Sequence, residues 1–93
     1  MLNIMSLFKT KRSFKITFGG GINTDLRFTI MSYLDSIGAR CDQVVSFGSH
    51  IQVFGESFKT NEEIENSLRT IFKMIDVRKT KNGIFISNKE VEC

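Results

Sequence analysis

The chain contains no proline and no tryptophan, and it has only one histidine and two cysteines. Without proline, nothing in the sequence forbids long regular helices and strands. Cys41 and Cys93 are too few and too far apart for a disulfide framework or a zinc set, and we expect a reducing, cytoplasmic setting. No apolar run approaches the ~20 residues of a membrane-spanning helix, so we expect no membrane partner.

The 93 residues fit one domain with a core of modest depth. Nine phenylalanines suggest that this core is rich in Phe. The 13 basic and 10 acidic side chains give a net charge of +3, which permits an anionic partner without requiring one. We expect an N-terminal arm at residues 1–12, a single domain at residues 13–88 and a frayed tail at residues 89–93.

The first half of the chain predicts a strand followed by a helix. Residues 13–18 alternate apolar and polar side chains, as a half-buried strand does. Asn23 or Thr24 can cap the helix that follows, and Gly38 is placed to terminate it. Phe28 and Met31 widen the apolar face of this helix, so it is either well covered or part of an interface.

The second half predicts a hairpin, a second helix and a final strand. Residues 40–47 and 50–54 read as two strands joined by a tight turn. Thr60 and Glu63 form a capping box, and a helical stripe follows it at Ile64, Leu68, Ile71, Phe72 and Ile75. The Lys81-Asn82-Gly83 segment then indicates either a small hairpin or one kinked strand at the end.

This order of elements predicts an α+β fold of the ferredoxin-like type, β-α-β-β-α-β. In such a fold two helices cover one face of an antiparallel sheet. Its first and last strands would be neighbours, and its uncovered face would be solvated or used for pairing with a second copy.

Gly19, Gly20 and Gly21 lie between the first strand and its helix. Their backbone N–H groups could hold an anion at the helix start. The phosphate-binding fingerprints are absent, however, and Asp25 would repel a phosphate. The alternative is a flexible connection that needs positive φ angles, which glycine adopts readily.

Basic residues cluster around the first and last predicted strands: Lys9, Lys11, Arg12, Lys15, Arg78, Lys79 and Lys81. If these strands are neighbours, the two clusters merge into one positive edge that could bind nucleic-acid phosphates. The alternative is a solvated edge whose charge prevents the addition of another strand.

Other chemical signatures are weak. RNA-binding sheets display several aromatic side chains on their central strands, whereas here Phe14 and Phe18 belong to the core pattern and Phe54 stands alone. His50 has no neighbour that indicates a catalytic triad or a metal site. We therefore predict no catalytic residue, no metal ligand and no cofactor.

The layout of the chain resembles a group of small ferredoxin-fold proteins. The likeness lies in the strand Phe14–Phe18, the helix ending Leu34–Gly38, the hairpin around Ser46-Phe47 and the helix start Thr60–Ile64. The group includes the metal-dependent nuclease-like subunit of CRISPR adaptation, virulence-associated protein D and the GhoS-type antitoxin. The resemblance implies this fold and a homodimer. The nuclease-like members carry an Asp at the end of the first strand, where this chain has Phe18-Gly19, so metal-dependent cleavage is in doubt.

These observations favour a small non-enzymatic binding or regulatory module that acts through a protein or nucleic-acid partner, as an inhibitor or antitoxin-like regulator does. A first alternative is a small metal-dependent ribonuclease of the resembling group. A second alternative is a module that senses an anion or nucleotide at the glycine triplet.

Overall fold

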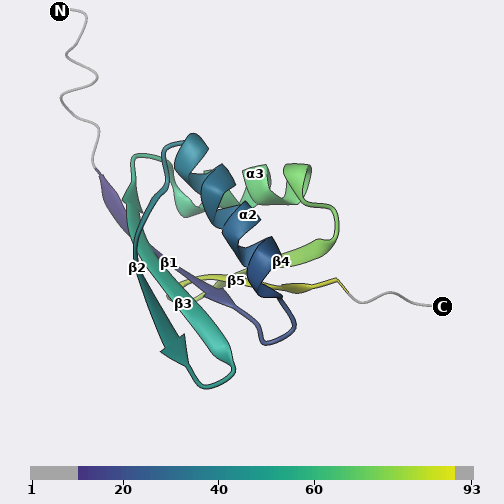
Figure 1. The fold of residues 1–93 in the computed structure, drawn as a ribbon. Coiled ribbons are helices and arrows are strands. Elements are labelled where there is room, and N and C mark those ends of the chain that lie inside the picture. The colour runs from purple at the N-terminus through teal and green to yellow at the C-terminus, as the bar shows by residue number, and fades with distance from the viewer. Residues whose placement is uncertain (1–10, 90–93) are drawn as a thin grey trace, which may run out of the picture.

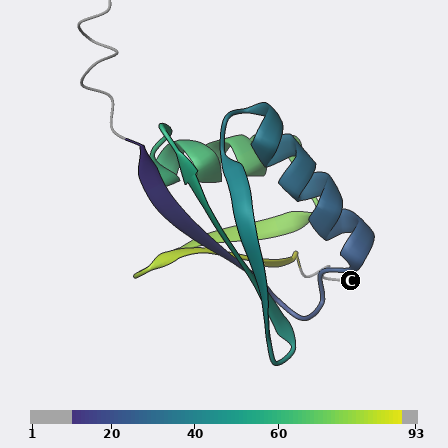
Figure 2. The ribbon, with the colours of Figure 1, turned by 60° about the vertical axis from the view of Figure 1, so that its left-hand side comes forward.

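The computed structural model of the protein describes residues 11–89. Lys9, most of the predicted arm and nearly all of the predicted tail lie outside the described residues. Within them the elements are β1 (Arg12–Phe18), α2 (Thr24–Ser36), β2 (Arg40–Phe47), β3 (His50–Ser57), α3 (Asn61–Ile71), β4 (Ile75–Thr80) and β5 (Gly83–Asn88). Both helices lie against one face of a curved sheet (Figure 1). Figure 2 shows that no helix of residues 11–89 covers the other face.

The five strands form one mixed sheet in the order β2-β3-β1-β5-β4. The predicted four-stranded, antiparallel ferredoxin-like sheet is therefore wrong. The physical reason is the turn at Lys81-Asn82, which closes a true hairpin because Thr80 and Gly83 are register partners. The chain end thus supplies two strands, and β5 returns parallel to β1 while β4 becomes an edge.

β1 is the centre of this sheet, with β3 antiparallel on one side and β5 parallel on the other. Each helix leads into a hairpin, α2 into β2–β3 and α3 into β4–β5, and the second strand of each hairpin pairs with β1. The close approach of β5 depends on Gly83, since a Cβ there would collide with the carbonyl oxygen of Lys15. Neither helix of residues 11–89 has the length and apolar character that a membrane crossing requires.

The core lies between the sheet and the helices, and isoleucine rather than phenylalanine is its commonest residue. Six isoleucines are at most 3 % exposed: Ile16, Ile30, Ile64, Ile75, Ile84 and Ile86. Of the eight phenylalanines among residues 11–89, only three are buried: Phe14, Phe18 and Phe72. The interpretation of a Phe-rich core is wrong, and five described Phe side chains remain partly or largely exposed.

The predicted caps of α2 are confirmed. The Oδ1 of Asn23 accepts a hydrogen bond from the Leu26 N–H at 2.8 Å, which satisfies one free donor of the first turn. At the other end Gly38 adopts a φ of 91°, a conformation that favours glycine. Its N–H donates to the Asp35 carbonyl at 3.1 Å, so the helix stops there.

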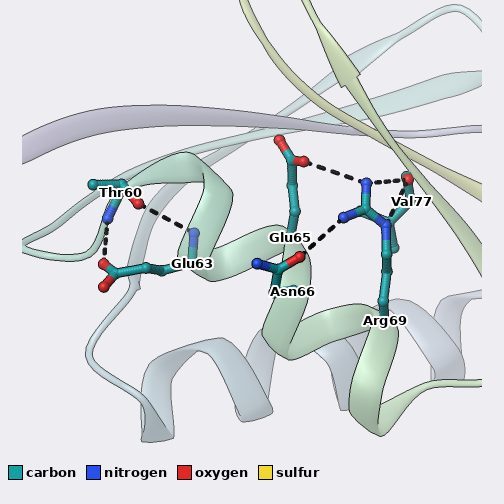
Figure 3. A network of polar contacts seen from close by, with 6 residues as sticks. All are labelled: Thr60, Glu63, Glu65, Asn66, Arg69 and Val77. Atoms are coloured by element: carbon teal, nitrogen blue, oxygen red, sulfur yellow. Dashed lines mark hydrogen bonds and ion pairs between the residues drawn. The ribbon is translucent and has the colours of Figure 1, made fainter.

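The capping box of α3 is also confirmed. The Thr60 hydroxyl oxygen accepts from the Glu63 N–H at 3.1 Å, and the Glu63 carboxylate accepts from the Thr60 N–H at 2.8 Å (Figure 3). The helix is shorter than the predicted stripe, because Phe72 already has extended backbone and Ile75 begins β4.

Arg69 joins α3 to the sheet. Its Nη2 donates to the Val77 carbonyl at 2.8 Å and to the Glu65 Oε1 at 3.3 Å (Figure 3). Glu65 is only 4 % exposed, and its Oε2 has no hydrogen-bond partner among the described residues. The guanidinium therefore compensates the buried carboxylate only in part.

Candidate nucleic-acid interface

A single row of register partners crosses all five strands on the face without helices. It consists of Val45, Gln52, Thr17, Phe85 and Arg78, in the order β2 to β4. Five of the six chain neighbours of these residues on the three central strands are buried beneath the helices: Ile16, Phe18, Val53, Ile84 and Ile86. Because side chains alternate along a strand, the row points away from the helices. We call this surface the open face.

Phe54 forms a second aromatic position on the open face. Its register partners are Lys15 on β1 and Gln43 on β2. Phe54 and Phe85 lie on β3 and β5, two strand spacings apart, and their register differs by two residues along β1. Standard strand dimensions place their Cα atoms roughly 12 Å apart. The two rings are thus separate planes, and each can take its own flat ligand group.

One end of the open face brings Phe85 close to His50. The ring centroids are 5.8 Å apart with an interplanar angle of 42°. A Cβ at Gly19, which follows β1 between them, would lie 3.3 Å from the Phe85 Cζ. The His50 Nδ1 lies 3.1 Å from the Ser49 hydroxyl oxygen. This end of the face therefore combines two rings with a hydroxyl group.

Positive charge borders the aromatic positions. Lys15 is half-buried beside Phe54, and Arg78 is exposed beside Phe85. The Arg78 Nε donates to the Asp76 Oδ2 at 2.8 Å, in a pair that is largely exposed. A guanidinium has five N–H donors, so this contact leaves others free to meet an anion.

The structure separates the basic residues that the sequence suggested would merge. β5 lies between β1 and β4, so no single positive edge forms from the two clusters. Lys11 lies 4.0 Å from the Glu56 carboxylate. Arg12 and Lys79 are register partners of the buried Ser57 and Ile84, so they lie on the helix side of the sheet. Lys81 lies in the turn between β4 and β5. Of the predicted residues within the described range, Lys15 and Arg78 share the open face.

The glycine triplet has a different structural role from the one expected. None of its residues has positive φ, a conformation that among the described residues occurs at Gly38 and Gly48. The prediction of a positive-φ connection is wrong. A Cβ would instead lie 3.2 Å from the Ser49 carbonyl oxygen at Gly20, and 2.8 Å from the Asn88 Nδ2 at Gly21.

Two backbone donors near the triplet are already engaged. The Gly19 N–H donates to the Ile86 carbonyl at 2.8 Å, and the Ile22 N–H donates to the Gly19 carbonyl at 3.1 Å. Anion binding at Gly19–Gly21 stays a prediction, with fewer free donors than the sequence suggested.

Phe85 is the residue that sequence reasoning missed. It lies between Ile84 and Ile86, both of which are buried. In a strand the middle residue of such a triplet must face the opposite side, so the alternation alone could have placed Phe85 with Phe54. The signal depended on recognising residues 83–88 as a strand in its own right.

The remaining reactive groups lie elsewhere. Burial raises the pKa of the Cys41 thiol to about 11, with smaller contributions from the Asp35 and Asp42 carboxylates. Asp25 is exposed in the first turn of α2. Among residues 11–89 no three His, Cys, Asp or Glu side chains gather where they could hold a metal ion.

No family model matches the chain, and comparisons with curated proteins and with solved structures found no match. The geometry of the open face is therefore the basis for assigning a function.

Proposed function

We propose that this domain is a non-enzymatic module that binds single-stranded nucleic acid on the open face of its sheet. The observation that carries the proposal is the placement of Phe54 and Phe85 on either side of β1, half-buried, on a face without helices. Sheets that bind single-stranded RNA use aromatic rings on their central strands in this way.

The chemistry of the open face suits unpaired nucleotides. Phenylalanine rings stack on any base, because every base has a π-face. Gln52 and Thr17 are register partners on β3 and β1, between the two rings. Their polar groups can hydrogen-bond to exposed base edges. A duplex would hide those bases in its stack, so we expect a preference for single strands.

Lys15 and Arg78 supply the electrostatic part of the binding. Each lies beside one ring, where a phosphate of a bound strand would pass. If each residue contacts one phosphate of a single strand, a plot of log affinity against log salt concentration should have a slope of about −1.4. Lys15→Ala should therefore weaken binding and reduce the slope by about 0.7.

Fluorescence anisotropy with labelled single-stranded RNA and DNA oligonucleotides tests the proposal. Phe54→Ala and Phe85→Ala should each weaken binding by roughly 5- to 150-fold, because one stacked base is worth about 1–3 kcal/mol. Ile71→Ala is the control, since Ile71 is a large exposed apolar side chain at the end of α3, away from the open face. It should leave the affinity unchanged.

Three outcomes would count against this function. Wild-type protein that binds none of the oligonucleotides removes it. Equal losses for Ile71→Ala and Phe85→Ala would assign the binding to general surface contact. Equal affinity for single strands and duplex would assign it to charge alone. Capture of a protein by the same face, without oligonucleotide binding, would favour a protein partner instead.

A further inference from the structure

The two edges of the sheet differ in how they are protected against pairing with another strand. β2 and β4 are the edge strands. β4 carries Asp76, Arg78 and Lys79 among its six residues, and charged side chains on an edge oppose the addition of a further strand. β2 carries Arg40 and Asp42 near its start, where its register against β3 shifts, and is uncharged from Gln43 to Phe47, of sequence QVVSF, with no proline. Over that segment the β2 edge lacks the charges that protect β4.

Exposed apolar side chains lie on both sides of the β2 edge. Val44 is 48 % exposed and Phe47 is 65 % exposed. Val44 is the register partner of the buried Val53, so it lies on the helix side, while Phe47 pairs with His50 on the open face. The β2–β3 hairpin projects beyond the helices (Figure 1), which leaves these side chains without cover from the described residues.

A shallow apolar cavity adjoins this edge on the helix side. Its volume is about 270 Å³. It is lined by Phe28, Met31, Ser32, Asp35 and Cys41. Phe28 is 54 % exposed, although the Arg27 guanidinium lies 4.8 Å from the centre of its ring. The apolar face of α2 therefore continues onto the β2 edge.

The charges around the edge cancel. Arg27 and Arg40 are balanced by Asp35 and Asp42, although the whole chain has a net charge of +3. Two copies of a basic protein repel each other over most of their surfaces. The neutral region around β2 is a place where that repulsion is weak.

We propose that β2 pairs antiparallel with β2 of a second copy of this chain across a two-fold axis. Two sheets of five strands then form one sheet of ten, with Phe28 and Val44 of each copy packed beside the seam. A two-fold interface uses the same surface on both copies, and β2 supplies both an open edge and the apolar side chains to cover it. The charged β4 edges lie at the two ends, so assembly stops at the dimer.

Sedimentation equilibrium across the micromolar range tests this interface. Wild-type protein should dimerise, Val44→Lys should be monomeric, and Phe28→Ala should weaken the dimer about tenfold. Thr80→Lys, which adds the same charge to the exposed end of β4, should leave the dimer intact. A wild-type protein that remains monomeric throughout overturns the proposal, as does a dimer that Val44→Lys leaves unchanged.

Hydrogen exchange on the wild-type protein gives a readout that does not depend on a variant folding. Alternate amides of β2 already point to β3, so within Gln43–Phe47 it is the outward-pointing amides that should exchange more slowly in concentrated than in dilute solution, while amides of β4 should not change. Protection that instead increases only on β4 or α3 would contradict the interface.

Discussion

His50 and Phe85 approach within 5.8 Å, measured between ring centroids, although they belong to β3 and β5 and β1 separates those strands. The two rings meet beyond the end of β1, at Gly19. Gly19 has no side chain that would occupy the space beside the Phe85 ring. Gly19, for which the sequence left open an anion site or a flexible connection, thus creates the space in which one aromatic plane of the open face lies.

Gly19→Val should displace the Phe85 ring, since its Cβ alone would lie 3.3 Å from the Phe85 Cζ. We expect oligonucleotide affinity to fall by roughly 5-fold or more, the lower bound for a lost stacking contact, with no change in the salt slope because no charge is altered. The anisotropy titration at two salt concentrations measures both. Unchanged affinity in a folded Gly19→Val variant would show that the position of Phe85 does not matter for binding.

Gly55→Ala should be among the most destabilising single changes in the sheet. The added Cβ would collide with the Arg40 carbonyl oxygen and lie 2.7 Å from the Phe14 Cζ. Overpacking of this kind costs about 1–3 kcal/mol and more where backbone must move, so we expect at least about 3 kcal/mol by urea denaturation. Ser13→Ala, an exposed change on β1, should stay within about 0.5 kcal/mol. Similar values for the two variants would contradict the packing described at Gly55.

We expect substitutions of Glu65 and Arg69 to have strongly non-additive effects on the free energy of unfolding. Arg69→Met should lower the free energy of unfolding by about 1–3 kcal/mol, because it removes the donors to Val77 and leaves the buried Glu65 carboxylate without a partner. Arg69 is 45 % exposed, which limits the effect. Adding Glu65→Met should restore much of the loss. Urea denaturation of the single and double variants checks this, and strict additivity would contradict it.

The Cys41 thiol should react slowly at moderate pH. Its pKa is raised to about 11 from an ordinary value of 9.0, so its thiolate fraction at pH 8 falls by about 100-fold. The unfolded thiol loses its proton first, so stability declines as pH rises from 9.0 towards 11 and is unaffected below that window. Mass spectrometry of iodoacetamide labelling in a Cys93→Ser background, folded against urea-unfolded, measures the difference. Equal rates would contradict the burial of Cys41.

The sequence was most informative where one local interaction decides the structure. The capping box at Thr60, the cap at Asn23 and the terminator Gly38 depend on hydrogen bonds within a few residues, and all are confirmed. The sheet was harder to predict, because whether β5 joins β1 depends on a long-range parallel pairing and on the close approach at Gly83. That one pairing changed the strand order and placed Phe85 beside Thr17.

The most direct test of the open face is a nuclear magnetic resonance titration of isotope-labelled protein with a short single-stranded oligonucleotide. We expect the largest amide shifts at Thr17, Gln52 and Phe85, with smaller shifts along α2 and α3. Shifts confined to the helix layer, or no shifts at saturating oligonucleotide, would contradict binding at the open face.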